Sequence, residues 1–243
     1  MLQTEKIYEG KAKILYSTDN PNILLTVYKD DATAFNAQKK GQIEGKGELN
    51  CQITAALYEW LEKKGIPTHF IDCPQPNQMR VKAVTIVPVE VVVRNIAAGS
   101  LCRQTGLPEG KVLTAPLVEY YYKSDELGDP LLTRDRIFLL DLVTSQRLDE
   151  IENLARKIND HLQSFFNRCD ITLVDFKLEF GVDSQQNLLL ADEISPDTCR
   201  LWDQHETDPQ AKVMDKDRFR KDLGQVSSGY QQVQKRVLAQ LKK

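Results

Sequence analysis

Hydrophobic and polar residues alternate along much of the chain with the period of β-strands, and three stretches follow the longer period of helices. At the N-terminal end the alternation predicts strands over residues 6–8, 14–16 and 23–28, with a turn at Gly10 between the first two. Residues 30–47 contain three glycines, alternating charges and few apolar side chains. We therefore expect a long loop there.

The middle of the chain changes from a helical to a strand-like pattern. Apolar residues recur at helical spacing over residues 48–64. Residues 79–94 are a nearly continuous β-branched run broken only by Pro88, which predicts two buried strands with a change of direction between them. We place the boundary between an N-terminal lobe, residues 1–85, and a C-terminal lobe, residues 86–243, within this run.

The C-terminal half begins with loops and then becomes regular. A strand is predicted over residues 114–123 and a long amphipathic helix over 145–169. A β-hairpin follows, with strands over 171–180 and 188–194 and a polar turn between them. Residues 226–241 have the pattern of a final amphipathic helix.

The two faces of this hairpin differ sharply. Because side chains alternate along a strand, Phe176 and its apolar neighbours share one face, while Asp175, Lys177 and Glu179 share the other. A symmetric turn would place Glu179 directly opposite Asp192. Like charges that face each other across a sheet are destabilising. Something positive should therefore lie between these two carboxylates.

A hard divalent cation is the obvious candidate, because it takes carboxylate oxygens and keeps coordination sites for phosphate. Lys177 alone cannot neutralise the acids, since Asp175 and Glu179 flank it on the same face. The alternative interpretation is a solvent-facing strand with scattered charges. We favour a metal–phosphate site because these acids occur among apolar residues of a buried sheet.

Two further segments carry cationic side chains suited to anions. Lys11 and Lys13 project from the Gly10 turn and could cover a polyphosphate, although an exposed basic hairpin fits the same pattern. Arg94 ends an apolar strand, and the small residues up to Ser100 follow it. Guanidinium and nearby backbone N–H groups make an anion pocket. Arg200 comes just after the acidic strand, where it can reach an anion shared with the metal.

Composition limits the classes of protein to consider. The length of 243 residues allows two lobes or one large domain, and the net charge of −3 gives no reason to expect nucleic acid as a partner. Neither an apolar signal core nor a stretch of membrane-spanning length is found, so we expect a cytoplasmic protein. Five widely spaced cysteines are typical of reduced, mostly structural thiols: Cys51, Cys73, Cys102, Cys169 and Cys199.

These features together favour phosphoryl transfer from a metal–nucleotide, in which catalysis consists mainly of positioning and charge neutralisation. No Ser/His/Asp or Cys/His arrangement and no dinucleotide fingerprint occurs, and His69 is assigned to packing or to the surface. The residues alone predict an ATP-dependent phosphotransferase or ligase that acts on a phosphorylated or carboxylated small molecule.

Five motifs sharpen this prediction. They are GKAK (10–13), VPVEVVVRNIAAGS (87–100), VDFKLEFG (174–181), DEISPD (192–197) and MDKDRFR (214–220), and they are spread from residue 10 to residue 220. In content and order they resemble the phosphoribosylaminoimidazole-succinocarboxamide synthase (SAICAR synthetase) family. The resemblance implies an α+β fold in which a small antiparallel-sheet lobe lies on a larger α+β lobe, with ATP in the cleft between them.

The resemblance also implies a reaction and its participants. ATP, carboxyaminoimidazole ribonucleotide (CAIR) and L-aspartate would be converted to SAICAR, ADP and phosphate in purine biosynthesis, with Mg²⁺ as the metal and a homo-oligomer as one possible assembly. A kinase of related shape and a catalytically silent nucleotide-binding module are the rival interpretations. A kinase would need no aspartate, and a binding module would not need both acids of the hairpin.

Carried over by motif, the resemblance assigns roles to fifteen residues. ATP contacts fall on Lys11, Ala12, Lys13 and Lys82, and magnesium ligands on Glu179 and Asp192. The reaction centre would be lined by Asp175, Lys177 and Lys123. Contacts to the ribonucleotide and other substrates would come from Arg94, Ser100, Arg200, Lys216, Asp217 and Arg220.

Overall fold

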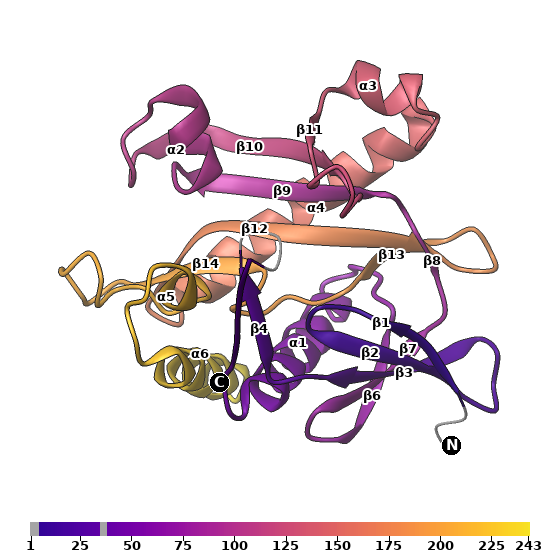
Figure 1. Ribbon diagram of the computed structural model, residues 1–243, viewed down its shortest axis with the longest axis horizontal. Coiled ribbons are helices and arrows are strands. Elements are labelled where there is room, and N and C mark those ends of the chain that lie inside the picture. Colours follow the sequence, from indigo (N-terminus) through magenta and orange to yellow (C-terminus); the bar gives the residue numbers. More distant parts are fainter. Residues whose placement is uncertain (1–4, 35–37) are drawn as a thin grey trace.

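The computed structural model describes residues 5–34 and 38–243 and has two main antiparallel sheets, one above the other in Figure 1. The α+β class and the two-lobe arrangement predicted from the sequence are confirmed. The N-terminal sheet has the strand order β1-β2-β3-β7-β6. Its strands are β1 (Lys6–Glu9), β2 (Lys13–Ser17), β3 (Ile23–Tyr28), β6 (Phe70–Gln75) and β7 (Gln78–Lys82).

The second sheet is organised around one long strand, β12 (Ile171–Val182), which crosses the middle of the molecule in Figure 1. Its order is β11-β10-β9-β12-β13, and two further strands, β8 and β14, also pair with β12. The other strands are β8 (Thr85–Ile86), β9 (Val89–Ile96), β10 (Val112–Tyr122), β11 (Leu131–Leu132), β13 (Leu188–Ala191) and β14 (Cys199–Asp203).

Three long helices cover the sheets, and they are α1 (Lys46–Glu62), α4 (Ser145–Asn167) and α6 (Val226–Leu241). Helix α1 packs against the N-terminal sheet, α4 packs against β12 and β9, and α6 packs against α1. The short helices are α2 (Ser100–Thr105), α3 (Arg134–Leu139) and α5 (Asp217–Arg220). Within the described residues, no helix combines the length and the apolarity needed to cross a bilayer.

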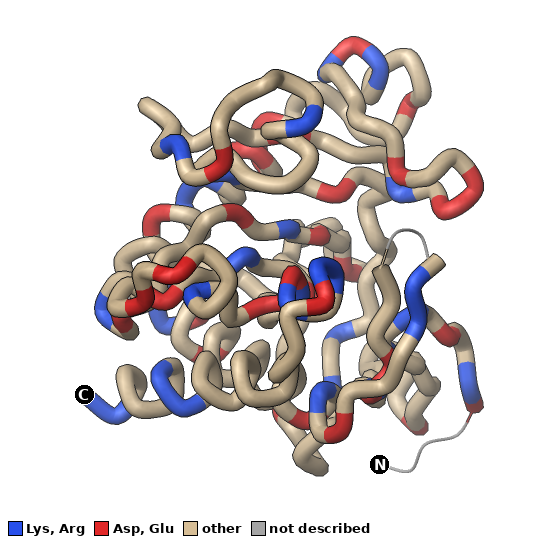
Figure 2. The backbone as a smooth tube through the Cα atoms, turned by 60° about the vertical axis from the view of Figure 1, so that its left-hand side comes forward, with Lys and Arg blue, Asp and Glu red and all other residues tan. Residues whose placement is uncertain are grey.

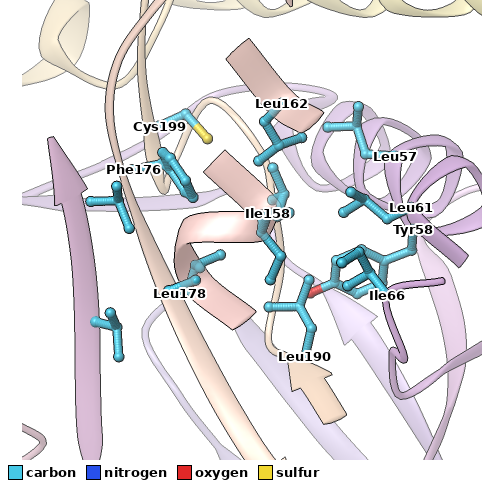
Figure 3. Packing of buried hydrophobic residues seen from close by; sticks show 14 of the residues in the cluster. Leu57, Tyr58, Leu61, Ile66, Ile158, Leu162, Phe176, Leu178, Leu190 and Cys199 are labelled. Carbon is cyan, nitrogen blue, oxygen red and sulfur yellow. The ribbon is translucent and has the colours of Figure 1, made fainter. Parts of the chain in front are cut away.

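One apolar core joins the two sheets. In Figure 3, Leu57 and Leu61 of α1 lie near Ile158 and Leu162 of α4, with Phe176 and the other labelled side chains beside them. The alternation predicted for β12 is confirmed, because Phe176, Leu178 and Phe180 belong to this core. Burial of the apolar face leaves the other face of β12 for polar side chains.

Two predictions about local structure are wrong. Within the predicted loop at 30–47, β4 (Asp31–Ala34) pairs with β5 (Lys39–Gln42), because the alternating pattern there buries Ala32 and Ala34. Residues 35–37 of that loop and residues 1–4 lie outside the described part of the chain.

The hairpin register also differs by one residue, since Glu179 is opposite Ala191 and not Asp192. The turn has five residues, in which the Asp183 carboxylate accepts N–H groups of Gln185 and Asn187. A five-residue turn cannot be symmetric about the bond between Gln185 and Gln186.

Candidate functional site

A cleft of about 1570 Å³ contains every predicted site residue except Asp217. Its walls come from the turn between β1 and β2, from β7, and from the polar faces of β9 and β12. Segments that are far apart in sequence therefore meet at one cavity, which is large enough for more than one small molecule.

At one end of the cleft, lysines neutralise the two predicted metal ligands. Glu179 forms ion pairs with Lys177 at 2.5 Å and with Lys123 at 2.8 Å. Asp192 pairs with Lys13 and, at 3.3 Å, with Lys177. Positive charge thus lies between the acids, as expected, and it comes from three lysines together.

Burial and ion pairing act in opposite directions on these groups. Burial alone would raise the pKa of Asp192, but Lys13 and Lys177 hold that pKa well below its usual range. Burial alone would lower the pKa of Lys13, but Asp192 and Glu193 raise it overall. Both partners therefore stay charged at neutral pH, which leaves the carboxylates available to a cation.

The donor set fits magnesium. Mg²⁺ is usually held by one or two carboxylates, with phosphate and water oxygens completing its coordination. Glu179 and Asp192 supply two carboxylates, and no group of three or more His, Cys, Asp or Glu side chains suited to a metal occurs among residues 5–34 and 38–243. An all-protein metal cage is therefore not formed by the described residues.

At the other end of the cleft, an arginine cluster surrounds Asp175. On β12 this residue is opposite Arg94 of β9 and Arg200 of β14, so the sheet register itself brings the three together. Asp175 accepts hydrogen bonds from Arg94 at 3.0 Å and from Arg200 at 2.7 Å. Arg94 and Asp175 are buried, and Arg200 is half-buried.

Arg94 is the most fully engaged member of the cluster. Its other guanidinium nitrogens donate to Glu119 at 2.6 Å, Ser100 at 2.8 Å and Tyr121 at 3.2 Å. Burial alone would lower the pKa of Arg94, but Asp175 and Glu119 raise it. An anion at this end would therefore meet a guanidinium whose orientation is already fixed.

Arg200 lies directly against the backbone of Gly99. A Cβ atom at Gly99 would be 2.7 Å from the Arg200 Cζ atom, and the φ of 57° there also favours glycine. Asp217, the predicted residue that does not line the cleft, accepts hydrogen bonds from Arg200 at 3.0 Å and Arg220 at 2.6 Å. Its position is behind the arginines, where it orients them.

Comparison with known proteins identifies one family over nearly the whole chain. The family model described as SAICAR synthetase matches residues 6–237. The chain belongs to the SAICAR synthetase family. A phosphoribosylaminoimidazole-succinocarboxamide synthase from Synechocystis is 67% identical over 239 residues, covering 98% of this chain and 90% of that protein. The enzyme from Trichodesmium erythraeum is 65% identical over 98% of this chain and 99% of its own length.

Solved structures of the family have the same fold. The synthase from Ehrlichia chaffeensis is 46% identical with a TM-score of 0.92, covering 97% of this chain and 99% of that one. A SAICAR synthetase in complex with ADP is 43% identical with a TM-score of 0.90, covering 95% and 96% of the two chains.

This SAICAR synthetase family member also has cleft residues that sequence reasoning missed. Glu193 is buried and pairs with Lys13 at 2.9 Å. Strand alternation would point Glu193 away from Asp192, but β13 ends at Ala191 and Asp192 has a φ of 61°. The irregular backbone lets successive acids contact the same lysine, a change that no periodic pattern predicts.

A buried ion pair in the wall of the cleft, of which Asp197 is a lining residue, was also missed. Lys46 at the start of α1 donates to Asp197 at 2.8 Å, and the Tyr230 hydroxyl of α6 donates to the same carboxylate at 2.6 Å. Lys216 is 3.8 Å from Asp197, and burial lowers the pKa of Lys216. In sequence, Lys46 is one of several charges in a polar segment, and nothing there distinguishes it.

His69 proves to be a buried residue that lines the cleft. Its ring meets Tyr58 edge-on at 5.8 Å, and its Nε2 atom has no hydrogen-bond partner among the residues that the structure describes. Burial, followed by the charge of Lys13, lowers the pKa of His69 to about 4. The surface position allowed by the sequence is therefore wrong, because His69 is buried.

Proposed function

We propose that this chain condenses CAIR with L-aspartate at the expense of ATP, giving SAICAR, ADP and phosphate in purine biosynthesis. The observation that carries the proposal is a single cleft in which the lysine-neutralised acids and the arginine cluster occur on the same face of β12. Membership of the family and 67% identity to a named synthase support the same reaction.

The nucleotide would occupy the end of the cleft below the β1–β2 turn. Lys11, Ala12, Lys13 and Lys82 line this end. Lys11 also reaches across the cleft to Asp125 at 2.6 Å. The solved relative with bound ADP supports nucleotide binding by the family. Lys11 and Lys13 would neutralise the phosphates, and Mg²⁺ held by Glu179 and Asp192 would supply further neutralisation of phosphate charge.

The ribonucleotide would occupy the arginine end. Arg94, Ser100, Arg200, Lys216 and Arg220 line it and match a phosphorylated substrate in charge. Asp217 would act as a positioning residue, because its contacts are to Arg200 and Arg220. A guanidinium fixed by neighbouring acids presents its remaining N–H groups in a defined direction.

The chemistry requires activation of a carboxylate, which is a poor electrophile. Its oxygen attacks the γ-phosphorus of ATP, ADP leaves, and an acyl phosphate forms. The amine of L-aspartate then attacks the acyl carbon, and inorganic phosphate leaves as the amide forms. Lys177 and Lys123 contact Glu179 at the acidic end of the cleft, where they can stabilise negative charge on the reacting groups.

Labelling the CAIR carboxylate with heavy oxygen tests this reaction. We expect one labelled oxygen in the released phosphate per turnover, with release dependent on L-aspartate. A kinase would leave the label in a stable phosphorylated product, and a binding module would release no phosphate. Formation of the amide together with unlabelled phosphate would contradict carboxylate activation.

Three expectations from the sequence remain proposals. They are a cytoplasmic location, a homo-oligomeric assembly and a lobe boundary between residues 85 and 86. Two contacts of the described residues bear on the boundary. Strand β8, at the proposed boundary, pairs with β12 of the second sheet, while α6 packs back onto α1.

A further inference from the structure

Two cysteines that are 22 residues apart in sequence meet between α1 and the N-terminal sheet. The Sγ atoms of Cys51 on α1 and Cys73 on β6 are 3.9 Å apart, and both thiols are reduced. Cys51 is fully buried, whereas Cys73 is exposed to solvent. The pair therefore combines one accessible sulfur with one protected sulfur that can reach it.

We propose that Cys51 and Cys73 are a reversible oxidation site, in which a peroxide oxidises Cys73 and Cys51 resolves the product to a disulfide. A disulfide needs an Sγ–Sγ distance of about 2.05 Å, so the two sulfurs must approach each other by about 2 Å. This movement is within reach of side-chain rotation and a small shift of β6 relative to α1.

The local environment assigns the two roles. The neighbouring Cys51 thiol lowers the pKa of Cys73 by hydrogen bonding, although burial, Asp72 and Glu59 oppose this effect. The hydrogen bond to Cys73, followed by burial, raises the pKa of Cys51. The exposed sulfur is therefore the better nucleophile toward a peroxide, and the buried sulfur is protected from direct attack.

The reaction balances with one peroxide. The Cys73 thiolate attacks one peroxide oxygen, the O–O bond breaks, and the other oxygen takes up a proton and leaves as water. Cys73 is then a sulfenic acid. The Cys51 sulfur attacks the sulfenic sulfur, an S–S bond replaces the S–O bond, and the hydroxyl leaves as a second water with the Cys51 proton. Two thiols are oxidised, and hydrogen peroxide is reduced to two waters.

Oxidation would act on the nucleotide end of the cleft through α1. One turn before Cys51, Gly47 brings the helix against β3, and a Cβ atom there would be 2.7 Å from the Tyr28 carbonyl oxygen. The Tyr28 ring lies 5.3 Å from the Lys13 Nζ atom. A shift of α1 would therefore displace Tyr28, which contacts Lys13. We expect weaker nucleotide binding in the oxidised form. This consequence rests on the proposed function.

Treatment of the purified full-length protein with hydrogen peroxide tests the site without any activity measurement. Titration of the thiols after denaturation should fall from five to three, and peptide mapping should recover residues 51 and 73 joined. Dithiothreitol should restore all five thiols. Cys102→Ser is the matched control, since Cys102 is half-exposed and should leave the 51–73 link unchanged.

Two variants separate the steps. Cys73→Ser should form no disulfide, while Cys51→Ala should accumulate a Cys73 sulfenic acid that dimedone traps. Links between other cysteines, or over-oxidation of Cys73 in the unaltered protein without a disulfide, would overturn the proposal. The Kd for ADP should rise on oxidation of the unaltered protein and stay constant in peroxide-treated Cys73→Ser. An unchanged Kd in the disulfide form would overturn the coupling, and loss of ADP binding in the reduced protein would instead contradict the proposed function.

Discussion

The buried histidine in the cleft makes stability sensitive to acid in a way that can be measured. His69 has a pKa of about 4 in the folded protein against an ordinary value of 6.5, because burial opposes protonation and Lys13 repels the proton. The unfolded chain therefore binds more protons than the folded one between these two values. Stability contributed by the neutral ring is fully present above about pH 6.5 and is lost as the pH falls toward 4.

The size of the effect follows from the two pKa values. At pH 5 the unfolded histidine is mostly protonated and the folded one mostly neutral, which costs about 2 kcal/mol of unfolding free energy relative to pH 7.5. His69→Gln removes this proton and should reduce the stability difference between the two pH values by the same amount. Whatever constant change the glutamine causes is present at both pH values and cancels.

Urea denaturation at pH 7.5 and pH 5 provides the assay. The unaltered protein, His69→Gln and the control His205→Gln are compared, since the His205 side chain is exposed. We expect the pH-dependent loss to shrink only in His69→Gln. An equal loss between the two pH values in all three proteins would refute the burial of a neutral imidazole at position 69.

Three further outcomes are expected. Glu179→Gln and Asp192→Asn should each abolish turnover at ordinary magnesium while circular dichroism stays native, and normal activity in either would remove the metal assignment. Arg94→Lys should raise the KM for CAIR far more than that for ATP, because lysine lacks the planar fork; equal effects would place Arg94 elsewhere. Lys46→Met should lower the free energy of unfolding by about 3–5 kcal/mol, because it leaves Asp197 buried without its nearest cation. Adding Asp197→Asn should recover part of that loss, and full stability of the single variant would contradict the ion pair.

The structure changes the expected stability of the metal-ligand variants. From sequence, two facing carboxylates repel each other, so removing one charge would hold or raise stability. In the fold, Glu179 is paired with Lys177 and Lys123. Removing its charge takes away the only ion pair that Lys123 forms among the described residues and the shortest ion pair of Lys177. We therefore now expect Glu179→Gln to be less stable than the unaltered protein.

Periodic segments were the most predictable part of this protein. The period-2 pattern of β12 correctly places Phe176 and Asp175 on opposite faces. A strand that buries one apolar face against a core must point the alternate side chains the other way. The register was wrong because the turn is held by the Asp183 side chain, a local contact that hydrophobic pattern does not encode. The hydrophobic pattern predicts that a strand exists, but the turn determines which residues face each other across the hairpin.

Residues whose role depends on contacts between distant segments could not be predicted. Lys46 and Asp197 are 151 residues apart, and only the packing of α1 under the cleft makes them partners. Cys51 and Cys73 were assigned structural roles for the same reason, since neither has a nearby cysteine in sequence. Glu193 was missed because the backbone leaves regular geometry at Asp192.

Strand β12 also sets the distance between the two ends of the cleft. It carries Asp175 in the arginine cluster and Glu179 at the acidic pair, and a strand advances about 3.4 Å per residue, so the two ends of the cleft are about 14 Å apart. Four neighbouring strands hold β12 by hydrogen bonds, and that spacing is therefore rigid. With its phosphate at the arginine cluster, the ribonucleotide must bring its carboxylate to the ATP phosphates at the acidic pair, so this substrate would be selected by length. Insertion of one residue between positions 175 and 179 would turn every later side chain to the opposite face, and this segment should accept no change in length.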